Sequence, residues 1–162
     1  MNSALYGNKP DLKALLAAFS ANAGDDALGR LVSAPQWDVL AEYMQPFSLP
    51  QSRVLIEQGA PDRTLYFLEE GSLTVHYEDA SGRIHLAILG AGSAVGEGGF
   101  FSRQPRSATV QAASACKLWS LTPMRFTELS NRHPMVALAL AMALGSVIST
   151  RLLNQRKRVA IT

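Results

Sequence analysis

One segment of the sequence, residues 95–110, brings together residue types that could bind a phosphorylated sugar. Glu97 is followed directly by Gly98 and Gly99, and Arg106 lies nine positions (106 − 97) beyond the glutamate. Glycine lets the backbone come close to a ligand because it has no Cβ, and successive N–H groups in such a turn bind anions. The fork of an arginine matches two phosphate oxygens, while a carboxylate accepts hydrogen bonds from sugar hydroxyls. The spacing predicts one pocket with an acceptor for a sugar and a cation for a phosphate.

A structural interpretation of the same residues is also open. Glu97 and Arg106 could form an exposed ion pair across a glycine turn, and such pairs contribute little to stability. The surrounding pattern favours the pocket, because a β-prone run follows Arg106 and would fix its backbone while the side chain points inward.

The elements that must position this segment are strands. Between about Phe47 and Leu121, short runs of Val, Ile, Leu, Tyr and Thr alternate with glycines, a pattern typical of strands joined by turns. We expect strands at residues 53–56, 64–69, 73–78, 83–89, 108–112 and 117–120. Strands this closely spaced favour a small antiparallel barrel or jelly roll.

One hairpin of this barrel has a predicted register in which Glu78 pairs with Arg83 around residues 79–82. That register gives an apolar inner face and a second face on which His76 lies opposite His85. The predicted apolar pairs are Leu73 with Ile88, Val75 with Leu86, and Tyr77 with Ile84, and Thr74 pairs with Ala87 on the second face.

Helical patterns flank the strands. Apolar residues recur at helical spacing after Asp11, Gly24-Asp25-Asp26 breaks that pattern, and a second helical run follows Pro35. After Pro123 we expect a short helix over 124–130 and a long one over 134–158. The fold class is therefore α+β, with N-terminal helices, a small antiparallel β-barrel or jelly roll, and a long C-terminal helix. We place an N-terminal helical extension at 1–34 and the binding domain at 35–162, with C-terminal helices within 123–158.

The segment closely resembles the phosphate-binding cassette of cyclic nucleotide-binding domains, which occur in catabolite-activator-type regulators, cyclic-nucleotide-dependent kinases and gated channels. The matching residues are Gly96-Glu97, Gly99-Phe100-Phe101 and Pro105-Arg106-Ser107-Ala108. Residues 55–62 and 65–75 are similar to the family's opening strands, and the likeness covers roughly 36–158. The sequence is thus identified as a member of this family from several segments together.

The resemblance implies a role for each residue of the cassette. Glu97 would accept a hydrogen bond from the ribose 2′-hydroxyl, and Arg106 would hold the cyclic phosphate, so the loss of Arg106 should be the more damaging. Ser107 would add its amide or hydroxyl near the phosphate or the base. The resemblance completes the expected ligand-binding set with Gly96, Gly98, Gly99 and Ala108. Gly98 departs from the family, which usually has Leu, Ile or Met there, a bulky residue that in the family helps to relay cassette movement to the helices.

The last helix is expected to cover the ligand or to join two copies of the chain. No charged residue occurs from Pro134 to Thr150, and we interpret this stretch as a helix buried in the protein or in a dimer rather than in a membrane. By position, Thr150 and Arg151 are candidates for a lid over the base, although Arg151 could instead begin a solvated basic end. The expected homodimer face consists of Val136, Leu140, Ala143, Val147 and Thr150, with Ala139 and Gly145 allowing close approach.

Composition and the remaining polar residues exclude several functions. The net charge of +2 gives no strong attraction to nucleic acid or lipid, and the single cysteine, Cys116, suits a reducing, cytoplasmic compartment. No nucleophile–base pair can be assembled, so we expect no enzyme and no cofactor. Two histidines alone make no metal site. The basic patch at 156–158 is followed by only four residues, too few for a helix-turn-helix, so we expect no direct sequence-specific DNA binding.

The favoured interpretation is a receptor that binds cAMP or cGMP without turnover and signals through its helices to an unknown effector protein. The alternative is a structural or protein-interaction domain of the same fold with a repurposed or vestigial pocket.

Phe100 and Phe101 are expected to lie in the core beneath the cassette.

Overall fold

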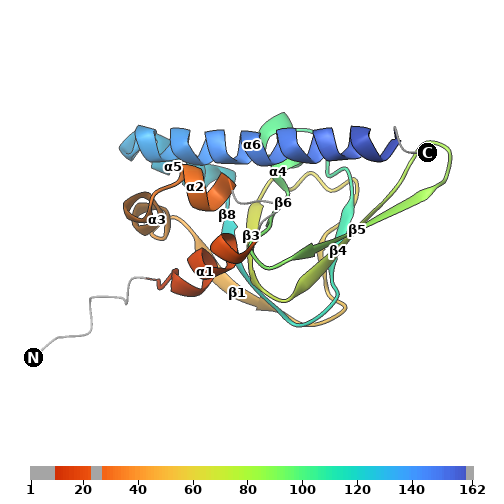
Figure 1. The fold of residues 1–162 in the computed structure, drawn as a ribbon, viewed down its shortest axis with the longest axis horizontal. Coiled ribbons are helices and arrows are strands. Elements are labelled where there is room, and N and C mark those ends of the chain that lie inside the picture. The colour runs from red at the N-terminus through yellow and green to blue at the C-terminus, as the bar shows by residue number, and fades with distance from the viewer. Residues whose placement is uncertain (1–9, 23–26, 160–162) are drawn as a thin grey trace, which may run out of the picture.

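The computed structural model describes residues 10–22 and 27–159, and the break expected at 24–26 lies outside these residues. Helices precede and follow a β-structure, and the last helix runs along one side of the molecule (Figure 1). The helices are α1 (Lys13–Ala21), α2 (Ala27–Leu31), α3 (Ala34–Leu40), α4 (Glu97–Ser102), α5 (Pro123–Arg132) and α6 (Pro134–Val159). The strands are β1 (Gln45–Leu49), β2 (Val54–Ile56), β3 (Leu65–Glu70), β4 (Ser72–Glu78), β5 (Ile84–Gly90), β6 (Ala94–Val95), β7 (Thr109–Ala112) and β8 (Cys116–Leu121).

The strands form two four-stranded antiparallel sheets, ordered β1-β8-β3-β6 and β2-β7-β4-β5. This arrangement confirms the predicted α+β class with a jelly-roll-like core between N-terminal and C-terminal helices. Strand β1 was not predicted, because Pro46 argues against a strand; it is tolerated here since β1 lies at the edge of its sheet. The two-residue strand β6 and the short helix α2 also escaped the sequence pattern.

The predicted register of the β4–β5 hairpin is wrong by one residue. Glu78 pairs with Ile84 instead of Arg83, and Leu73 pairs with Leu89 instead of Ile88. The cause is the turn: Asp79 N–H donates to the Arg83 carbonyl over 3.0 Å, which leaves a three-residue loop where we expected four. Gly82 has φ +78°, which suits the left-handed residue that ends such loops.

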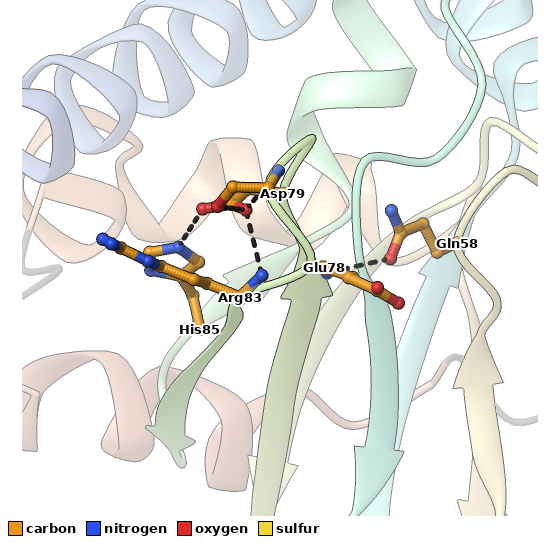
Figure 2. A network of polar contacts seen from close by, with 6 residues as sticks. Gln58, Glu78, Asp79, Arg83 and His85 are labelled. Carbon is orange, nitrogen blue, oxygen red and sulfur yellow. Dashed lines mark hydrogen bonds and ion pairs between the residues drawn. The ribbon is translucent and has the colours of Figure 1, made fainter.

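The side chain of Asp79 holds this turn in place (Figure 2). One carboxylate oxygen accepts hydrogen bonds from the Ser81 amide and hydroxyl and from the Arg83 amide, and the other lies 2.9 Å from His85 Nε2. The hydrogen bonds from Ser81, His85 and Arg83 lower the pKa of Asp79 far below its usual range. The register is therefore set by local turn chemistry, against the apolar pairing that we expected.

A one-residue shift moves every β5 side chain to the other face of the sheet. His76 therefore lies opposite Leu86 and His85 opposite Tyr77, so the predicted pairing of the two histidines is wrong. The predicted burial of the alternate β5 residues is also wrong. Those residues form an exposed apolar row, with 74%, 66% and 70% of their surface accessible, at Ile84, Leu86 and Ile88.

The main hydrophobic core lies between the helices and the β1-β8-β3-β6 sheet. Phe19 of α1, Trp37 of α3 and Phe67 of β3 meet there, with ring centroids 4.9 to 6.0 Å apart. Residues of the expected N-terminal extension thus pack into the same core as the strands. A second apolar cluster fills the space between the two sheets and includes Cys116, which is buried and free, as expected for a small core residue.

Helix α6 buries one face in the main hydrophobic core. The predicted dimer face is therefore wrong. Val136, Leu140, Ala143 and Val147 are at most 8% exposed because they pack within the same chain. The exposed apolar residues lie on another face of the helix: Met135, Leu138, Met142, Leu152 and Leu153. By length and composition alone, residues 134–154 could also cross a membrane, although the core helix of a soluble protein passes the same test.

Candidate functional site

A cavity of about 160 Å³ lies where the cassette, the second sheet and α6 meet. Its lining includes every residue of the expected ligand-binding set, which comes from α4, from its flanking turn and from the loop before β7. These residues are Gly96, Glu97, Gly98, Gly99, Arg106, Ser107 and Ala108. Of the two lid candidates, Arg151 also lines the cavity, whereas Thr150 is exposed on α6. The remaining wall is apolar and was not predicted: Ile56, Val75, Val95 and Val110.

Arg106 is the buried cation of this cavity, with 4% of its surface exposed. Its Nη1 donates to the Gly96 carbonyl over 2.9 Å, and its Nη2 donates to the Thr64 carbonyl and to Asp62 Oδ2 over 2.6 and 2.5 Å. The Nε–H is buried and has no hydrogen-bond partner among the residues that the structure describes. A buried donor without a partner costs about 1–3 kcal/mol. Arg106 thus brings a guanidinium with an unsatisfied donor to the lining of the cavity.

The backbone of Arg106 is fixed by the loop after β2 rather than by a strand, because β7 begins only at Thr109. Its amide donates to the Ala60 carbonyl over 2.9 Å, and its carbonyl accepts from the Gly59 amide over 2.7 Å. We expected strand pairing to hold this residue. The loop after β2 fixes this residue instead, because it forms hydrogen bonds with both the amide and the carbonyl of Arg106.

Asp62 is the acidic partner that sequence reasoning missed. Partial burial raises the pKa of Asp62, but the hydrogen bonds from Arg106 and Thr64 outweigh it and lower the pKa below its usual value. Its carboxylate also accepts from the Thr64 amide and hydroxyl over 3.2 and 2.8 Å. The only signal in the sequence was the turn-forming Pro61-Asp62 pair, which does not indicate a partner 44 residues away.

Two glycines allow the guanidinium to lie against the cassette backbone. At Gly96, which has φ +88°, a Cβ would lie 2.7 Å from Arg106 Nη1 and 2.8 Å from the Thr64 carbonyl oxygen. At Gly99 a Cβ would lie 3.3 Å from the same Nη1. Gly98 differs, because a Cβ there would meet no atom of a described residue within 4 Å. The position at which this chain departs from the family pattern is therefore open space.

Glu97 faces the cavity from the first turn of α4 and forms an ion pair with α6. Arg151 Nη1 donates to Glu97 Oε1 over 2.7 Å, and Arg151 Nη2 donates to the Ala94 carbonyl over 2.9 Å. Both side chains are partly buried, with 17% of Glu97 and 26% of Arg151 exposed. The Glu97 carboxylate, which is expected to bind a sugar hydroxyl, thus also connects the cassette to α6.

The two phenylalanines of α4 have different surroundings. Phe100 is buried, and its ring lies 5.1 Å from that of Phe126 in α5. Phe101 is 42% exposed, so the expectation that both residues lie in the core is wrong for Phe101. In the described part of the chain, no group of three His, Cys, Asp or Glu residues is placed to hold a metal ion.

The sequence of the chain is similar to those of known proteins. A family model described as the cyclic nucleotide-binding domain matches residues 46–133, more than half of the chain. The chain is 30% identical over 116 residues to the cAMP-activated global transcriptional regulator CRP of Salmonella typhimurium, which covers 70% of this chain and 55% of the regulator. It is 36% identical over 98 residues to a cyclic nucleotide-gated potassium channel of Rhizobium etli, covering 60% of this chain and 26% of the channel. The chain thus spans about half the length, or less, of these relatives.

Solved structures share the fold. A cyclic nucleotide-binding domain from Methylobacillus flagellatus superposes with a TM-score of 0.79 at 22% identity, covering 92% of this chain and 82% of that one. The catabolite activator protein of Thermus thermophilus gives a TM-score of 0.69 at 24% identity, covering 83% of this chain and 62% of that one. At these identities the likeness is one of fold alone.

Proposed function

This chain belongs to the cyclic nucleotide-binding domain family, and on that premise we propose that it is a receptor for a cyclic purine mononucleotide, cAMP or cGMP, which it binds without turnover. The observation that carries the proposal is the unpartnered, buried Nε–H of Arg106 in a cavity that also holds the Glu97 carboxylate. The cyclic phosphate would accept from this Nε–H and from the backbone amides of the cassette. The ribose 2′-hydroxyl would donate to Glu97.

The size of the cavity bears on how the ligand would lie. Pockets for drug-sized ligands usually measure about 300–1,000 Å³, and this one measures about 160 Å³. It would therefore enclose the sugar and phosphate, leaving the base at the mouth near Val75 and Arg151. Arg151 could stack on a purine face there by cation–π attraction. Thr150, the other lid candidate, would have to approach from its exposed position on α6.

Signalling would pass through the ion pair of Glu97 and Arg151. A hydroxyl that donates to Glu97 competes for the carboxylate that Arg151 now binds, so the ligand acts on a contact between the cassette and α6. A ligand shifts a conformational equilibrium only by its difference in affinity for the two states. Nucleotide binding would thus change how firmly α6 is held, and an effector would respond to that change.

We also propose that two copies join through α6, by a face other than the one first expected. Met135, Leu138, Met142 and Leu152 are exposed, and with the small residues Gly145 and Ser149 they follow alternating steps of three and four residues. That spacing is typical of the seam of a coiled coil. A cytoplasmic location remains a prediction. The absence of direct sequence-specific DNA binding also remains a prediction, because the side chains of residues 156–158 lie outside those described.

Calorimetric titration with cAMP, cGMP and cyclic di-GMP tests the receptor proposal. We expect one-site binding of a cyclic mononucleotide by the wild type and a large loss in Arg106→Gln. The alternative, a structural domain with a repurposed pocket, predicts that neither protein binds any of the three at millimolar ligand. Chromatography of the nucleotide after incubation checks turnover, and we expect it to be recovered unchanged.

A further inference from the structure

A second concave surface lies next to the cassette, between α4 and α5, with a volume of about 410 Å³. We call it the α4–α5 groove. It is lined by Arg63, Phe100, Phe101, Arg103, Met124 and Phe126, together with small or uncharged residues of α5. Two of its apolar side chains are open to solvent, with Phe101 42% exposed and Met124 77% exposed. Nothing in the proposed nucleotide function uses this surface.

The charges on the groove are of one sign. Arg63 and Arg103 line it, and no acidic residue does so in the described part of the chain. Arg63 Nη2 reaches the Phe100 carbonyl only at 3.5 Å, and its Nε is buried without a hydrogen-bond partner in the described part of the chain. Neither arginine forms an ion pair with a residue that the structure describes. No described carboxylate therefore neutralises either cation.

The backbone of Arg103 has an unusual conformation for a residue other than glycine. Arg103 ends α4 with φ 59°, in the left-handed region that helix ends usually reserve for glycine. That conformation costs a non-glycine residue roughly 1–2 kcal/mol. No other described group receives a hydrogen bond from this side chain to offset the cost. Arg103 is exposed at this helix end and lines the groove.

From these observations we infer that the α4–α5 groove docks an acidic peptide segment of a partner protein, with one bulky apolar side chain inserted against Phe101 and Met124. Carboxylates would bind Arg63 and Arg103 at the rim, where complementary charge selects the partner. Two isolated cations over an apolar floor suit such a peptide better than a nucleic acid, which requires a longer row of phosphate contacts. A second copy of the chain would instead meet the exposed face of α6.

The position of the groove links it to the nucleotide cavity. α4 forms a wall of both, with Gly98 and Gly99 toward the cavity and Phe101 toward the groove. Arg63 lies in the chain between Asp62 and Thr64, two of the residues that bind Arg106. A peptide in the groove would therefore contact the same helix and the same loop that hold the phosphate-binding arginine. Docking itself does not depend on the nucleotide function.

Nuclear magnetic resonance titration of the whole chain tests the docking site with two defined probes. One is the blocked hexapeptide Glu-Glu-Phe-Leu-Glu-Glu, and the other replaces its four glutamates by lysines. We expect the acidic peptide to shift the amide resonances of Phe101, Arg103 and Met124 and the lysine peptide to leave them unchanged. The double variant Arg63→Gln/Arg103→Gln should bind the acidic peptide about five- to tenfold more weakly, as expected for two exposed charge contacts.

The matched control is Arg53→Gln/Arg83→Gln, which removes two exposed arginines elsewhere and changes the net charge equally. It should bind the acidic peptide as the wild type does. Any of four results would overturn the docking site. The two peptides could bind equally well, or the control variant could bind the acidic peptide as weakly as the double variant does. The shifted resonances could be confined to α6, or the acidic peptide could fail to bind at millimolar concentration. Calorimetry with cAMP on the wild type and on both double variants separates the two proposals. Failure of cAMP to bind the wild type would contradict the receptor function and would leave the peptide result unaffected.

Discussion

Replacing Arg106 with lysine keeps the positive charge of the cavity and removes the fork. In the wild type Nη1 donates to Gly96 and Nη2 donates to Thr64 and Asp62, while the buried Nε–H has no partner among the described residues. A lysine has all its donors at one point, so it cannot satisfy both sets. The variant should lose at least one charge-assisted hydrogen bond to the phosphate, about 1.5–3 kcal/mol. At 1.4 kcal/mol for each factor of ten, the Kd for the nucleotide should rise about 10- to 100-fold.

The assay for this variant must separate affinity from folding. Because Arg106 is buried and binds three groups of the fold, Arg106→Lys should also unfold at a lower denaturant concentration. Calorimetry below the unfolding transition then measures the Kd of the folded protein. Arg53→Lys, at an exposed position, is the matched control and should change neither property. Glu97→Gln should weaken binding less than Arg106→Lys. A folded Arg106→Lys variant with wild-type affinity would refute the role given to the guanidinium.

Three further predictions concern the cassette, pH and assembly. Gly98→Ala should keep the fold and stabilise α4 by up to about 1 kcal/mol. Gly96→Ala should destabilise the protein by at least about 1 kcal/mol, because its Cβ would lie 2.7 Å from Arg106 Nη1. Equal denaturant midpoints for the two variants would contradict this prediction. The lowered pKa of Asp62 contributes stability above its unfolded pKa of about 3.9, and this is lost as pH falls through the folded value. The wild type should therefore lose more stability between pH 7 and pH 3 than Asp62→Asn, and parallel urea midpoints would count against it. Met142→Glu should shift a dimer to monomer in sedimentation experiments, and an unchanged sedimentation coefficient would exclude this face as the seam.

The cassette could be predicted from sequence because its information is local. Glu97, the glycines and Arg106 lie within one short segment, and the glycines mark where the backbone must approach a side chain. The parts of the site contributed by distant segments were not visible. Asp62 reaches Arg106 across 44 residues, and no pattern in its own neighbourhood indicates that contact.

The hairpin and the last helix show where periodicity misleads. Apolar pairing favoured one register for β4 and β5, but the hydrogen bonds of Asp79 and the left-handed Gly82 select a shorter loop and reverse the faces of β5. In α6, apolar residues occur on more than one face, so spacing alone cannot say which face the chain's own core takes. The core takes the face of Leu140 and leaves Met142 exposed.

The central claim is that Arg106 offers its free Nε–H to the phosphate of a cyclic nucleotide. The resonance of this N–H can be observed directly in a nitrogen–proton correlation spectrum and assigned by its disappearance in Arg106→Lys. Titration with cAMP should shift it downfield in step with saturation, as a new hydrogen bond to an anion forms. A resonance that stays in place while the protein becomes saturated would contradict the account.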